Sequence, residues 1–100
     1  MLFRSAGLAS VRVPLQLWRA AADHHQPNPW YEEAVRASLP VPPEYHVVAN
    51  ADHYAFLAPC NPEFAAAVPQ ICTDPPGFDR EAFHRRFNAE VVRFFSNTLR

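Results

Sequence analysis

Large apolar residues gather in two short runs in the first half of this chain, and both predict β-strands. Val11–Arg19 is almost continuously apolar, which is typical of a strand that is covered on both faces, as in a parallel sheet. Pro14 is acceptable there only near the start of the strand, where its missing N–H matters least. The second run predicts a strand over Tyr45–Ala49.

The segment between the two runs predicts a helix. Asn28-Pro29 is a favourable opening, because Asn caps free amides and Pro at the first helical position has no N–H to satisfy. Apolar residues then recur with helical spacing at Trp30, Ala34, Val35 and Leu39. Pro40 ends the pattern. Strand, helix and strand in this order predict a βαβ unit with parallel strands and a right-handed crossover.

The second half predicts helices and turns. Residues 2–9 are expected to form a short lead-in, Pro62–Ala67 a short helix that Pro69 ends, and 73–78 a turn. Asp79 is the expected N-cap of a long closing helix. One face of that helix is apolar and comprises Phe83, Phe87, Val91, Phe94, Phe95 and Leu99. Two strands are too small a surface to cover this face fully.

Composition narrows the class of protein. One hundred residues suffice for one domain, and no second domain is expected. The nine positive charges are all Arg, they are spread along the chain, and the net charge is −1, so nucleic acid is not an expected partner. No apolar run reaches the ~20 residues of a membrane span. Eleven prolines against two glycines suggest a piece of a larger fold, because phosphate loops and nucleophile turns need Gly.

Asp23 and His53 are the candidate catalytic residues, because each follows one of the two predicted strands. In open parallel sheets, functional groups collect at the carboxyl ends of the strands. A carboxylate there can accept from one imidazole nitrogen and leave the other to act as a base. The alternatives are a solvated or capping acid for Asp23 and a hydrogen-bonded loop histidine for His53.

Several motifs resemble the C-terminal third of an α/β-hydrolase, and more narrowly the predicted dienelactone hydrolase group. They are Val13-Pro-Leu-Gln-Leu-Trp-Arg-Ala-Ala-Ala-Asp23, Asp23-His-His-Gln-Pro27, His46-Val-Val-Ala-Asn-Ala-Asp-His53, His53-Tyr-Ala-Phe-Leu-Ala-Pro-Cys60, Ile71-Cys72 and Gly77-Phe-Asp-Arg80. The resemblance covers nearly all of this chain but only the last part of the family's fold. It implies that residues 1–100 are the C-terminal fragment of one α/β-hydrolase domain. It also implies that Asp23 is the acid and His53 the base of a nucleophile-acid-base triad.

The sequence departs from the family pattern at two points. Asp52 stands before the histidine, where such proteins often have Gly. Asp52 is itself a poor triad acid, because neighbouring side chains in an extended segment diverge. The chain also lacks G-x-S-x-G and G-x-C-x-G, so no residue in it is expected to be the nucleophile.

Cys60 and Cys72 lie in one Pro-rich connection and are expected to form a disulfide, with two buried thiols as the alternative. A disulfide would favour the periplasm or secretion, and free thiols the cytoplasm.

The sequence also contains weaker candidates for metal ligands and for pocket residues. His24 and His25 are adjacent and have no spaced partners, so neither a metal nor an organic cofactor is expected. Tyr54 and Phe56 could line an acyl pocket, although core packing is the competing role for both.

The sequence therefore predicts part of a hydrolase for small esters or lactones, inactive alone because the nucleophile lies outside this chain. The alternative is a small, non-enzymatic interaction module. It would bind a partner, or a second copy of itself, through the apolar face of the closing helix.

Overall fold

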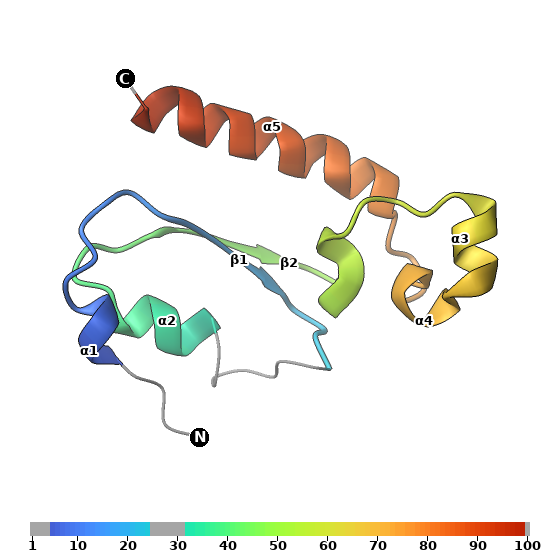
Figure 1. Cartoon of the computed structure of the whole chain (residues 1–100), viewed down its shortest axis with the longest axis horizontal. Coiled ribbons are helices and arrows are strands. Elements are labelled where there is room, and N and C mark those ends of the chain that lie inside the picture. The colour runs from blue at the N-terminus through green and yellow to red at the C-terminus, as the bar shows by residue number, and fades with distance from the viewer. Residues whose placement is uncertain (1–4, 25–31, 100) are drawn as a thin grey trace.

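A computed structural model describes residues 5–24 and 32–99 of the chain. Its centre is a two-stranded parallel sheet made of β1 (Gln16–Ala20) and β2 (Glu44–Val48), paired in register from Gln16 with Glu44 to Ala20 with Val48. The helix α2 (Glu32–Ser38) lies on one face of the sheet, and the long helix α5 (Arg80–Thr98) crosses the other (Figure 1). The expected α/β arrangement with parallel strands is therefore present.

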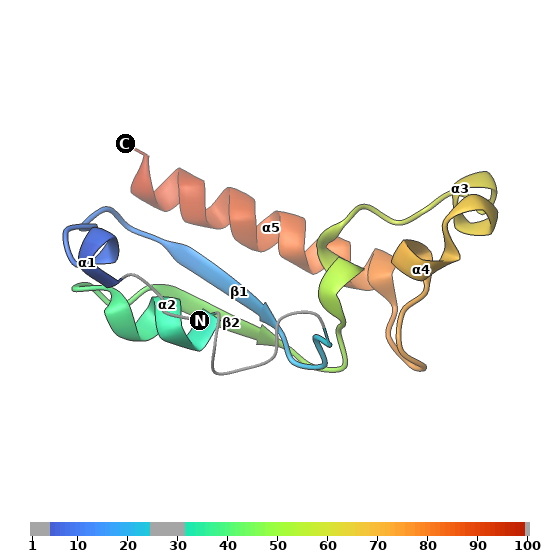
Figure 2. The same cartoon turned by 60° about the horizontal axis from the view of Figure 1, so that its bottom comes forward.

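The remaining elements are short. The helix α1 (Ser5–Leu8) precedes β1. The 3-10 helix η1 (His53–Phe56) follows β2, and then come α3 (Pro62–Ala67) and α4 (Pro69–Cys72). These last three elements lie beyond the carboxyl ends of the strands, toward the end of the molecule where α5 begins (Figures 1 and 2). No helix in the described part of the chain is both long and apolar enough to span a bilayer.

The boundaries correct one of the sequence predictions. The strand expected over 11–19 is formed only from Gln16, because Pro14 cannot donate to a ladder and delays its start. The helix α3 ends at Ala67 as expected, and Pro69 then begins the additional helix α4, where a missing N–H is harmless. The expected helix opening at Asn28-Pro29, including Trp30, lies outside the described residues.

Two helix predictions are confirmed, and so is the N-cap expected for the second of them. Asn61 accepts a hydrogen bond from the backbone N–H of Phe64 and starts α3. Asp79 accepts from the N–H of Ala82 and starts α5. These side chains satisfy amides that the first turn leaves open.

The core is small and aromatic, and it lies between α5 and the sheet. Phe83 is 1% exposed, and its ring contacts those of Trp18, Phe56, Phe78 and Phe87, with centroids 5.3–6.1 Å apart. Small buried residues complete the packing: Ala20, Val48, Ala51 and Ala55. Phe95 and Leu99, which the sequence places on the same apolar face, are 50% and 74% exposed. The last turn of α5, after the 9% exposed Phe94, thus lies outside the core.

Two further contacts hold the segment between η1 and α5. Cys60 and Cys72 form the expected disulfide, which joins the residue before the N-cap of α3 to the end of α4. Arg80 is buried at the start of α5, donates through Nε and Nη2 to the Asp74 carboxylate, and reaches the carbonyl of Ile71. The buried arginine is thereby paired with an acid, as a charge away from water requires.

Candidate functional site

The segments that follow β1 and β2 stay side by side beyond the strands. Ala21 N–H donates to the carbonyl of Val48 at 3.0 Å, and Ala22 N–H donates to that of Ala51 at 2.8 Å. Asn50 makes this path possible by adopting a left-handed φ of 59°, which Asn tolerates better than most residues. Its side chain donates to the carbonyl of Pro76. The two loops therefore deliver their next side chains to one place.

Those side chains are Asp23 and His53. Asp23 Oδ2 lies 3.1 Å from His53 Nδ1, although the residues are 30 positions apart in the sequence. The Asp23 side chain is 6% exposed and that of His53 is 30% exposed. The carboxylate is therefore shielded while part of the ring reaches solvent. In this contact Nδ1–H donates to the carboxylate, and Nε2 is then the nitrogen that can accept a proton.

Asp52 holds both loops in place from the residue before His53. Its Oδ1 accepts from the backbone N–H of His53 at 2.7 Å and from that of His24 at 3.1 Å. Its Oδ2 lies 3.1 Å from Nδ1 of His24. Asp52 thus caps η1 and binds the residue that follows Asp23. It is a positioning residue for the pair and not the acid of the pair.

The site is also fixed to α5. His84 Nε2 lies 2.7 Å from the carbonyl oxygen of Ala55, so the middle of η1 is hydrogen-bonded to the long helix. Phe56 packs against Phe83 and Phe87, with ring centroids 5.6 Å apart in both cases. Tyr54 places its ring edge-on to the ring of His53 at 4.9 Å. Phe56 is thus part of the core cluster, whereas Tyr54 lies against the candidate base.

The hydrogen bonds to Asp52 have an electrostatic consequence. Burial alone would raise the pKa of this carboxyl group, but the donors from His53 and His24 outweigh burial and lower the pKa from 3.8 to about 2. A carboxylate that accepts several N–H bonds is favoured in its charged form.

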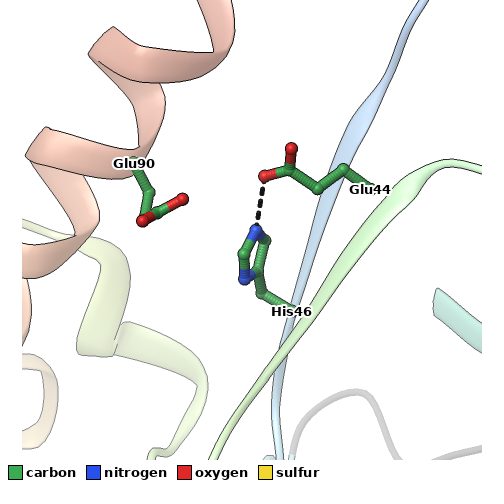
Figure 3. Close-up of side chains that lie close together, drawn as sticks. All are labelled: Glu44, His46 and Glu90. Atoms are coloured by element: carbon green, nitrogen blue, oxygen red, sulfur yellow. Dashed lines mark hydrogen bonds and ion pairs between the residues drawn. The ribbon is translucent and has the colours of Figure 1, made fainter.

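A second group of polar side chains lies on the α5 face near the start of β2. Glu44, His46 and Glu90 each bring one ligand atom within 4.8 Å of the others, which is a spacing that could suit a metal ion (Figure 3). Glu44 Oε2 lies 2.6 Å from His46 Nε2, and the His46 ring stacks on Trp18 at 4.2 Å. However, the guanidinium of Arg93 bridges Glu44 and Glu90. The positive charge that a cation would bring is therefore already supplied by the protein.

These contacts give that group a structural role. Arg93 lowers the pKa of Glu44 to about 2, with smaller contributions from His46 and Gln16. Gln16 donates to Glu44 at 2.7 Å and accepts from Trp18 Nε1 at 2.8 Å. The group links both strands to α5.

Sequence reasoning anticipated the Asp23–His53 contact but missed the partners of Asp52 and the group around Glu44. An Asp directly before a helical turn is an N-cap signal, which could have identified Asp52 as a cap. Glu44 and His46 are two apart in a strand and hence share a face with Val48, which could have placed both against α5. Of the adjacent histidines, His24 pairs with Asp52, and His25 lies outside the described residues.

Comparison with known proteins adds no precedent for this arrangement. No protein-family model matches the chain, and neither a curated protein nor a solved structure matches it significantly.

We expect stability to fall in acid because of Asp52 and Glu44. Folding lowers both pKa values to about 2, from 3.8 and 4.5. Folding therefore favours the ionised groups, and their contribution is complete above about pH 5 and disappears as the pH falls toward 2. Urea unfolding at pH 5, 4, 3 and 2.5 would measure this slope. The Asp52→Asn and Glu44→Gln variants should each flatten it, and an unchanged slope in both would contradict the assignment.

Proposed function

We propose that Asp23 and His53 are the acid and base of a nucleophile-acid-base triad that hydrolyses small esters or lactones. The observation that carries the proposal is the 3.1 Å contact between Asp23 Oδ2 and His53 Nδ1. The burial of the carboxylate supports it as well. The resemblance of the chain to the last part of an α/β-hydrolase supplies the reaction class.

Each residue has one task in this mechanism. Asp23 selects the tautomer with the proton on Nδ1 and stabilises the imidazolium that forms during reaction. His53 takes the proton of a Ser or Cys nucleophile through Nε2, and later activates the water that releases the acyl group. Asp52 keeps the loop of His53 beside the loop of Asp23.

The nucleophile of this triad comes from polypeptide outside the 100 residues. The chain has no glycine-flanked Ser or Cys. Both cysteines are joined to each other. The 100 residues therefore supply half of a catalytic site.

A non-enzymatic interaction module is the second candidate function. The observation that favours it is the exposure of three large apolar side chains, two on α5 and one at its C-cap. Val92 is 64%, Phe95 50% and Leu99 74% exposed. Apolar groups gathered in this way are typical of surfaces that contact other proteins.

Nitrogen-15 NMR of the His53 ring tests the proposed acid–base pair. In the native chain at neutral pH we expect the neutral ring to carry its proton on Nδ1. Asp23→Asn should shift the population toward the Nε2–H tautomer, because the amide no longer demands a donor. Asp79→Asn is the matched control, since Asp79 accepts from the backbone N–H of Ala82 at the start of α5 and Asn is an equally good N-cap. Equal tautomer populations in the native chain and Asp23→Asn would refute the pair.

An assay with p-nitrophenyl acetate tests where the nucleophile lies. The chain alone should hydrolyse this ester no faster than its His53→Ala variant does. Turnover that His53→Ala abolishes would show that the 100 residues contain a complete site, and the proposal of an external nucleophile would then be wrong.

A further inference from the structure

The two flanks of α5 differ in chemistry. The flank on the β2 side is charged: Arg93 pairs with Glu44, and Arg86 and Glu90 line a groove of about 550 Å³ along β2. The opposite flank is apolar in the C-terminal half of α5. There Phe95 borders a groove of about 320 Å³ together with Val91, Phe94 and the residues that lead into β1, Pro14 and Leu15. Val92 and Leu99 are three before and four after Phe95, so they lie on this apolar flank as well.

The edge of the sheet that adjoins the apolar flank is the outer edge of β1. Leu15 O and Ala21 N bond to β2, and backbone groups alternate between the two edges of a strand. The backbone groups of Gln16 and Trp18 therefore point to the other edge of β1. Among residues 5–24 and 32–99, no strand pairs with β1 there. An edge of this kind can accept another strand.

The size of the molecule indicates how much surface is left to cover. The accessible surface is 6758 Å², whereas a compact monomer of 11.3 kDa has about 5,700 Å². The radius of gyration is 15.4 Å, against about 13 Å for a compact chain of this length. The excess of about 1,000 Å² is close to what one partner buries in a standard interface, about 800 Å².

We propose that a second copy of this chain covers the β1 edge and the apolar flank of α5. A two-fold axis beside β1 would pair the two β1 strands antiparallel and extend the sheet to four strands. It would also place the two α5 helices on one face of that sheet, with their apolar flanks toward each other. The charged flank of each α5 faces away from the two-fold axis. A net charge of −1 per chain gives little repulsion between the two copies. If the proposed function holds, the polypeptide with the nucleophile would compete for the same edge.

Sedimentation equilibrium of the isolated chain tests the dimer. The native chain should approach twice 11.3 kDa as its concentration rises through the micromolar range. Phe95→Glu should weaken dimerisation at least about tenfold, because it puts a charge into an apolar contact. Val92→Glu is the second variant and should act in the same direction. The matched control is Phe64→Glu on α3, since Phe64 is 49% exposed and Phe95 is 50% exposed.

Hydrogen exchange tests the pairing of the β1 edge. The amides of Gln16 and Trp18 should exchange more slowly as the dimer forms, while that of Leu17, which faces β2, should change little. A chain that stays monomeric would overturn the proposal. A dimer that Phe64→Glu weakens as much as Phe95→Glu, or one without added protection at Gln16 and Trp18, would also overturn it. None of these results bears on the tautomer of His53.

Discussion

Phe83→Ala is expected to lower the free energy of unfolding by about 3–5 kcal/mol, which is the usual effect of deleting a buried aromatic ring. Phe83 is 1% exposed, and its ring lies between Trp18 on the sheet and Phe56 on η1. Removing it opens a cavity where α5, the sheet and η1 meet. Because this core is small, few other contacts can compensate for the loss.

The same substitution should disturb the candidate site. η1 is held to α5 by Phe56 and by the hydrogen bond between His84 and Ala55. Once the ring of Phe83 is absent, η1 should move more freely, and the Nδ1–H tautomer of His53 should be less favoured. A change in this tautomer without any change at Asp23 would show that α5 positions the base.

Urea unfolding at one fixed protein concentration measures the stability effect, because dimerisation would make stability depend on concentration. Phe83→Leu is the control that keeps most of the side-chain volume. Its free energy of unfolding should fall by less than about 1.5 kcal/mol. Phe95→Ala is the control that removes an exposed ring instead of a buried one. Its free energy of unfolding should fall by well under half as much as that of Phe83→Ala. A loss below about 1.5 kcal/mol for Phe83→Ala would mean that the core does not depend on this ring.

The sequence was most informative where one local rule decides the structure. Asp79 is the N-cap that starts the helix predicted for it. The approach of Asp23 to His53 was also predictable, since parallel strands end at the same edge and each residue follows a strand. That these strands belong to a hydrolase sheet stays a prediction, because a two-stranded unit fits many larger α/β folds.

Sequence reasoning was least informative where distant parts of the chain decide the outcome. The exposure of Phe95 and Leu99 confirms that two strands do not cover the whole apolar face, but the helical pattern alone does not distinguish these residues from the buried Phe83. Helical periodicity shows that a face is apolar and not what covers it. Asp52 likewise accepts a hydrogen bond from His24, which is 28 residues away in the sequence. That contact exists only because the two loops lie side by side.

Reducing the Cys60–Cys72 disulfide is expected to lower the free energy of unfolding by about 3 kcal/mol in the chain-entropy model, in which the bond stabilises mainly by restricting the unfolded chain. For a domain of this size, that loss corresponds to a fall in Tm of about 12–24 °C. Without the bond, the α3–α4 segment is held mainly by the contacts of Arg80 with Asp74 and Ile71. Both helices are short and contain no buried residue.

Thermal unfolding with and without dithiothreitol measures the effect. A Cys60→Ala/Cys72→Ala variant should melt near the reduced native chain and should not respond to the reductant. A native chain with the same Tm in both conditions would show that the bond does not contribute to stability. A fall of the expected size would agree with the expectation that the disulfide favours an oxidising compartment, because a domain that loses this much stability on reduction would be only marginally stable where thiols stay reduced.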